Sequence, residues 1–71
     1  MTLDQLPLNR SAIIHSIHKS SITPKLVEMG LYPGKQVSMV FKAPFGDPIA
    51  IDIDGYTLSL RKSEASQIEM A

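Results

Sequence analysis

The chain contains neither cysteine nor tryptophan, and no segment approaches the roughly 20 consecutive apolar residues of a membrane-spanning helix. Without cysteine there is no disulfide, no thiolate metal site and no cysteine nucleophile. Small secreted domains usually depend on disulfides, so this composition favours a cytoplasmic protein. Residues 1–5 also lack the basic start and apolar run of a signal peptide.

A net charge of either sign is also missing, because seven basic side chains balance seven acidic ones. This balance argues against a general nucleic-acid binder. The charges are unevenly placed: residues 1–42 carry five basic and two acidic side chains (net +3), and residues 43–71 carry two basic and five acidic ones (net −3). Such a dipolar chain can orient on a charged partner, although a solvated surface of mixed sign gives the same pattern.

At 71 residues the chain has room for a single domain, residues 1–71. Its core must be thin, because a domain of this size buries only about 60% of its unfolded surface.

The pair Asp54-Gly55 separates two alternating segments and predicts a β-hairpin over residues 49–60. A type I′ turn needs positive φ at both central residues, which Asp-Gly tolerates. The two-residue loop fixes the register, and the resulting pairs all place their side chains on one face. These pairs are Ile53 with Tyr56, Ile51 with Leu58 and Ile49 with Leu60.

Three further strands are predicted. Residues 36–42 alternate with Val37, Met39 and Phe41 pointing inward, and the two prolines in residues 43–48 make that stretch a loop. Residues 11–18 form a strand whose alternation breaks at 13–14, which indicates a bulge or burial on both faces. Residues 67–70 form a last short strand.

A short helix is predicted before residue 30, with Thr23 as its N-cap and Pro24 at its first position. Gly30 then closes the helix in the left-handed conformation, and Pro33-Gly34 suits the centre of a type II turn. Ser63 is expected to cap one further helical turn. Leu3 and Leu6 are expected to plug one end of the core.

Five short strands, one short helix and a helical turn cannot bury a flat sheet in so few residues. The fold predicted is therefore mainly β, a small and partly open SH3-like β-barrel.

Residues that could carry chemistry are few. His15 and His18 lie three apart on a strand, hence on opposite faces, and are expected to face solvent on an edge strand. Asp52 and Asp54 share a face, but a solvent-exposed hairpin tip does not provide the desolvated setting that a general acid–base pair needs. There is no glycine-rich phosphate loop and no nucleophile motif. We predict no enzyme activity, no metal site and no cofactor.

A binding module remains. A small barrel that binds nucleic acid needs aromatics on a strand face, flanked by basic residues. Phe41 and Tyr56 are expected in the core, which leaves Tyr32 and Phe45 in loops without a basic stripe. Two apolar corners, residues 29–33 and 43–46, are the candidate surfaces, because Met and aromatics are enriched in interfaces.

Several segments match a known family in order and spacing: residues 6–7, 25–34, 43–49 and 58–65, with Ile68. The chain resembles the FeoA family, small cytoplasmic proteins of bacterial ferrous iron transport. The resemblance implies an SH3-like barrel that acts as a non-catalytic accessory of FeoB, a membrane permease with a cytoplasmic GTP-binding domain. The family usually has Arg at the position of Lys25, and Gly near the turn where this chain has Asn9, a residue that tolerates the same left-handed backbone. The candidate partner contacts are Lys25, Met29, Leu31, Tyr32 and Phe45.

The same motifs also resemble the C-terminal domain of iron-dependent repressors, whose chains carry DNA-binding and dimerisation domains upstream. An alternative function is therefore a self-associating or nucleic-acid-binding small-barrel module. Because an open barrel leaves strand edges unpaired, we expect a monomer or a weak homo-oligomer. We expect no membrane insertion of its own and no nucleic acid as partner.

Overall fold

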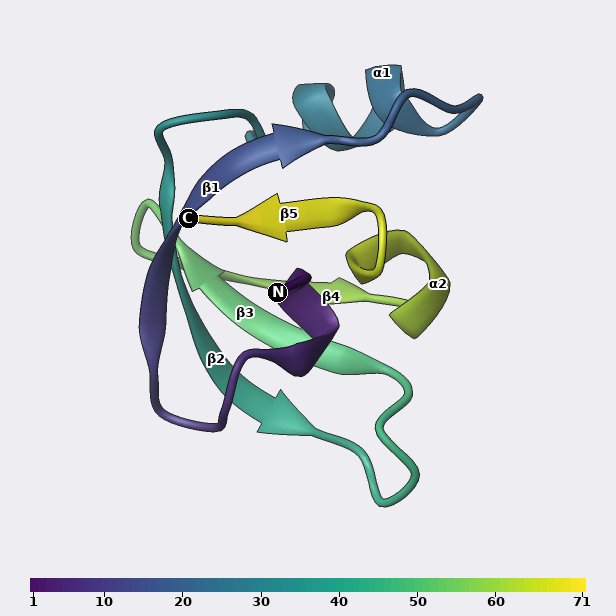
Figure 1. Ribbon diagram of the computed structural model, residues 1–71. Helices are drawn as coiled ribbons and strands as arrows, with labels where there is room; N and C mark the ends of the chain where they lie inside the picture. The colour runs from purple at the N-terminus through teal and green to yellow at the C-terminus, as the bar shows by residue number, and fades with distance from the viewer.

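The computed structural model describes all 71 residues and contains one five-stranded antiparallel sheet in the order β4-β3-β2-β1-β5 (Figure 1). The strands are β1 (Ser11–Ile17), β2 (Gln36–Lys42), β3 (Ile49–Ile53), β4 (Tyr56–Leu60) and β5 (Ile68–Met70). The helices are a 3-10 turn (Leu3–Gln5), α1 (Thr23–Glu28) and α2 (Lys62–Ala65). The sheet curls around one core, and α2 joins its two edge strands, which confirms the small barrel-like fold.

The hairpin of β3 and β4 has the predicted register, with Ile53 opposite Tyr56 and Ile49 opposite Leu60. Asp54 and Gly55 both have positive φ, 52° and 85°, as a type I′ turn requires. The prediction for Tyr56 is wrong, because its side chain is 46% exposed. Its hydroxyl donates a hydrogen bond to the carbonyl of Met29, at 2.6 Å, so the ring lies against the end of α1 rather than in the core.

A register shift in β2 also moves Phe41 away from its predicted place. Val37 and Met39 are buried as expected, but Phe41 is 52% exposed. Met39 pairs with Ile51 and Phe41 pairs with Ala50, so Val40 is an extra residue on β2. Such a bulge reverses the side-chain alternation beyond it, which turns Phe41 outward.

The irregularity predicted in β1 is present, as a shift of register between Ile14 and Ser16 in the pairing with β5. Both His15 and His18 are exposed. However, β1 lies between β2 and β5, so it is not the edge strand that we expected.

Both helices begin at slightly different residues from those predicted. Thr23 lies inside α1, and Ile22 is the N-cap. The Thr23 hydroxyl instead accepts from the Ser20 N–H and donates to the His18 carbonyl, so it fixes the turn before the helix. Similarly, Arg61 rather than Ser63 precedes α2.

Fourteen apolar residues form the core, and no polar side chain is buried. They come from every element: Leu3, Leu6, Ile14, Leu26, Leu31, Val37, Met39, Ile49, Ile51, Ile53, Leu60, Ala65, Ile68 and Met70. The predicted burial of Leu3 and Leu6 is therefore confirmed. No helix is long and apolar enough to cross a membrane.

Candidate partner-binding site

The chain leaves α1 through a tightly bonded corner, residues 29–34, which we call the helix-end corner. Gly30 has a φ of +91°, and its N–H donates to the carbonyl of Val27 at 3.0 Å. The N–H of Leu31 reaches the carbonyl of Leu26, also at 3.0 Å. These two bonds are those of a Schellman motif, and they confirm the left-handed Gly30 that the sequence predicts.

A second turn completes the helix-end corner. The Lys35 N–H donates to the Tyr32 carbonyl at 3.2 Å, and Gly34 between them has a φ of +94°. These features are those of the type II turn predicted for Pro33-Gly34. Because the Tyr56 hydroxyl also holds the Met29 carbonyl, the corner is attached to β4 as well as to α1.

The ring of Tyr32 is partly covered by a charged pair. Lys35 Nζ lies 5.4 Å from the ring centroid, within the range of a cation–π contact. The same Nζ lies 2.8 Å from Asp54 Oδ1 and 2.7 Å from Asp54 Oδ2. The hydrogen bond to Asp54 raises the pKa of Lys35 above its ordinary value. Tyr32 is thus an exposed aromatic held in a defined position.

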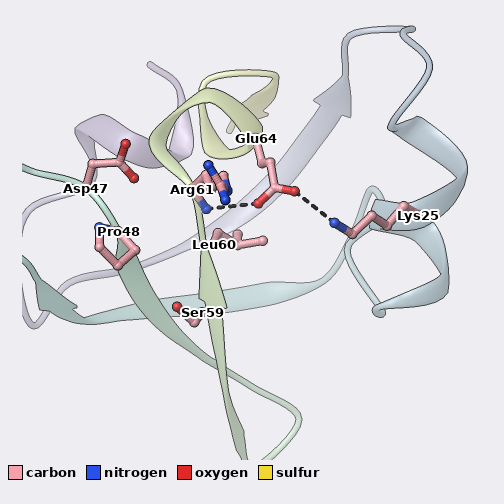
Figure 2. A pocket seen from close by; sticks show the side chains of 7 residues that line it. All are labelled: Lys25, Asp47, Pro48, Ser59, Leu60, Arg61 and Glu64. Atoms are coloured by element: carbon pink, nitrogen blue, oxygen red, sulfur yellow. Dashed lines mark hydrogen bonds and ion pairs between the residues drawn. The ribbon is translucent and has the colours of Figure 1, made fainter.

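A polar groove lies at the end of β4 (Figure 2). We call it the β4 groove, and its volume is about 500 Å³. Lys25 of α1 lines one side, the segment before β3 another, and the start of α2 a third. The lining residues are Lys25, Asp47, Pro48, Ser59, Leu60, Arg61 and Glu64.

The two carboxylates of the β4 groove already have donors. Glu64 Oε1 accepts from the Arg61 N–H at 2.9 Å, and Glu64 Oε2 lies 3.2 Å from Lys25 Nζ. The Arg61 N–H, and then Lys25, hold the pKa of Glu64 below its ordinary value. Asp47 Oδ1 accepts from the Lys62 N–H at 3.0 Å.

The structure separates the five predicted contact residues. Met29, half-buried, and Tyr32, 42% exposed, lie in the helix-end corner, while Lys25 lines the β4 groove. Phe45 is 96% exposed in the loop between β2 and β3, which projects away from α1 (Figure 1). Leu31 is completely buried, so its side chain belongs to the core and presents nothing to a partner.

Sequence reasoning missed most of the groove. Arg61 and Glu64 appear in the sequence only as surface charges near a strand end, and Asp47-Pro48 only as a loop. The one local signal was the spacing of Arg61 and Glu64, which lets a glutamate bond the backbone three residues before it. No three side chains among His, Cys, Asp and Glu gather closely enough to hold a metal ion.

Fold and site together define a small SH3-like domain with a fixed apolar corner and a polar groove. The FeoA domain family matches residues 1–71, and the chain belongs to this family.

Named relatives are similar to the chain in sequence, and those with solved structures are similar in fold as well. The chain is 34% identical, over 99% of its length, to an Fe(2+) transport protein A/Fe(2+) transporter FeoB fusion protein of Porphyromonas gingivalis, but it spans only 8% of that protein's length. The solved structure of iron(II) transport protein A from Clostridium thermocellum is 39% identical, with a TM-score of 0.93; 99% of this chain and 44% of that one are covered.

Zinc-bound FeoA of Stenotrophomonas maltophilia, described as an SH3 domain protein, is 34% identical with a TM-score of 0.88, covering 100% of this chain and 89% of that one. A manganese-dependent transcriptional repressor shares the fold with a TM-score of 0.91 but only 16% identity; this chain matches 35% of it. That likeness to the repressor concerns the fold alone. The FeoA relatives support the prediction that the chain belongs to the FeoA family.

Proposed function

We propose that this protein is a non-catalytic cytoplasmic accessory of bacterial ferrous iron transport that binds the cytoplasmic part of a FeoB-type permease. One observation carries the proposal: in the Porphyromonas gingivalis relative, a domain 34% identical to this chain is covalently joined to the FeoB transporter. Domains that are fused in one protein are held at high effective concentration, which favours partners that also associate when they are separate.

The helix-end corner suits this role physically. It presents Met29 and Tyr32 from a backbone that its own hydrogen bonds already fix, so little conformational entropy is lost on binding. Aromatic side chains and methionine are also enriched at protein interfaces. Lys25 and Phe45 are secondary contacts in this proposal, and the buried Leu31 supports the corner from beneath.

The test is capture of a detergent-solubilised FeoB-type permease by this protein, with and without a GTP analogue. We expect the wild type to retain the permease, and Tyr32→Ala and Met29→Ala to retain much less of it. Leu8→Ala is a matched control, because Leu8 is also exposed (51%) but lies before the start of β1, far along the chain from α1.

Equal capture by all variants would remove the helix-end corner from the proposal. No capture by the wild type would contradict the proposed partner. Ferrous iron uptake by cells carrying the same variants provides the second readout, and the order of the variants should match that seen in capture.

A further inference from the structure

Only one edge of the sheet is open. The edge of β5 is covered by the N-terminus, because Thr2 forms a bridge with Glu69 and the Met70 N–H donates to the Met1 carbonyl. At the other edge, β4 pairs with β3 and with no other strand. An uncovered strand edge is a template for a further strand.

The register tells which backbone groups of β4 are free. In a hairpin with a two-residue loop, Ile53 and Tyr56 form the first hydrogen-bonded pair, and every second pair after it is bonded. The N–H and C=O groups of Thr57 and Ser59 therefore point away from β3. They make no bond to a turn, a loop or a side chain of this chain, so they offer two donors and two acceptors along one line.

The same edge leads into the β4 groove, which Ser59 lines (Figure 2). There the carboxylates of Asp47 and Glu64 each accept a hydrogen bond from the protein itself, and Lys25 is paired with Glu64. The guanidinium of Arg61, in contrast, makes no hydrogen bond or ion pair within the chain. The charged side chain in the groove that lacks a partner is thus Arg61, and a guanidinium can bind a carboxylate through two parallel hydrogen bonds.

We propose that β4 and the β4 groove bind an extended segment of a partner protein, which adds to the sheet beside β4 and places a carboxylate against Arg61. Main-chain bonds to Thr57 and Ser59 supply the affinity, and the charge pair fixes the register of the added strand. A groove of about 500 Å³ is of ordinary size for such recognition. That the segment belongs to a FeoB-type permease rests on the proposed function above.

The experiment uses isotope-labelled protein and the purified cytoplasmic domain of a FeoB-type permease. We expect the amide signals of Thr57 and Ser59 to shift and to become protected from hydrogen exchange. Ser59→Pro removes an outward N–H without touching the bonds to β3, so affinity should fall by about tenfold. Ser59→Val keeps the N–H, so its affinity should fall less than that of Ser59→Pro.

Arg61→Gln tests the charge pair separately, and it does so even where Ser59→Pro fails to fold. Affinity should fall several-fold, and its dependence on salt should weaken with it. Lys62→Gln is the matched control, since Lys62 is the neighbouring cation and does not line the groove. Equal binding by wild type, Ser59→Pro and Arg61→Gln would overturn this inference and leave the proposed function standing.

If the permease domain does not bind at all, the proposed function fails and the open edge is tested by itself. The probe is then a short peptide of alternating threonine and valine that ends in glutamate, compared with its glutamine version. The inference is supported if the peptide shifts only the amide signals of Thr57, Ser59 and Arg61, and if the glutamate peptide shifts them more than the glutamine peptide does. No shift at millimolar peptide overturns it. The inference is also overturned if the same amides are protected without peptide and the solution mass rises from monomer to dimer at higher protein concentration. A second copy of the chain would then occupy the edge.

Discussion

The two loops that carry the predicted contacts differ in how they are held. The helix-end corner is attached at both ends by backbone hydrogen bonds, at its first residue also by the Tyr56 hydroxyl, and beneath by the buried Leu31. The loop of residues 43–48 is closed by two backbone bonds, Ala43 N–H to the Pro48 carbonyl and Gly46 N–H to the Ala43 carbonyl, and it leaves Phe45 96% exposed.

This difference shows that an apolar side chain in a loop can serve stability or recognition, and that burial distinguishes the two. In the helix-end corner the roles are divided between neighbours, since Leu31 is buried while Tyr32 is exposed. In the other loop Phe45 has no role in the core. Substitution of the buried Leu31 should therefore affect stability, whereas substitution of the exposed Tyr32 or Phe45 should leave stability nearly unchanged.

The largest effect is expected from removing the support of the corner. Leu31→Ala should lower the free energy of unfolding by about 2–5 kcal/mol, because it leaves a cavity in a small core. Phe45→Ala should change it by no more than about 0.5 kcal/mol. Urea unfolding of both variants measures this, and a similar loss in both would contradict the division of roles described here.

Glycine substitutions compare the backbones of the two loops. Gly30 and Gly46 both have positive φ, +91° and +80°. Gly30→Val should cost about 1–3 kcal/mol, because a β-branched residue is strained there and the buried Leu31 prevents the corner from relaxing. Gly46→Val should cost less, because no atom lies within 4 Å of the added Cβ. Equal shifts in melting temperature would mean that the corner is no more rigid than the loop.

The attachment of the corner to β4 is tested by Tyr56→Phe. This change deletes the 2.6 Å bond to the Met29 carbonyl and should cost about 0.5–1.5 kcal/mol. Hydrogen exchange of the Gly30 and Leu31 amides should accelerate, while the amides of residues 43–48 should not change. Unaltered exchange at the corner would show that the Schellman bonds hold it unaided.

The smallest effects are those of pH, and they concern Glu64 in the β4 groove and Lys35, which lies over the ring of Tyr32. The pKa of Glu64 is lowered in the folded protein, so its contribution is present above the ordinary pKa of a glutamate, about 4.3, and is lost as pH falls through the folded value. The pKa of Lys35 is raised, so its contribution is present below about 10.4 and is lost as pH rises through the folded value.

Glu64→Gln should therefore be less stable than the wild type at neutral pH, and the difference should vanish in acid. Lys35→Gln should show a difference that vanishes only in strong base. Denaturant unfolding across the pH range measures both. A Glu64→Gln difference that persists in acid would mean that the glutamate acts by packing rather than by charge.

Features set by neighbouring residues could be predicted from the sequence. The type I′ turn at Asp54-Gly55, the left-handed Gly30 and the register of the hairpin follow from backbone preferences within a few residues and from a strict two-residue alternation. The ordered motifs of the FeoA family were also readable in the sequence. The start of α1 was displaced, because the Thr23 hydroxyl bonds the turn before the helix. The start of α2 was also displaced: its N-cap is Arg61, whose N–H donates to Glu64.

What the tertiary structure decided concerns residues that lie far apart in the chain. No local feature of the sequence marks Val40 as a bulge, because the bulge arises from the pairing of β2 with β3. The bulge is what turns Phe41 outward. The β4 groove joins residue 25 to residues 47–48 and 59–64. Its composition depends on how the sheet curls and where α1 packs, which are settled by burial of the shared core. Local backbone preferences determine the turns of this protein. Only the packing of the shared core determines which distant residues come together to line the groove.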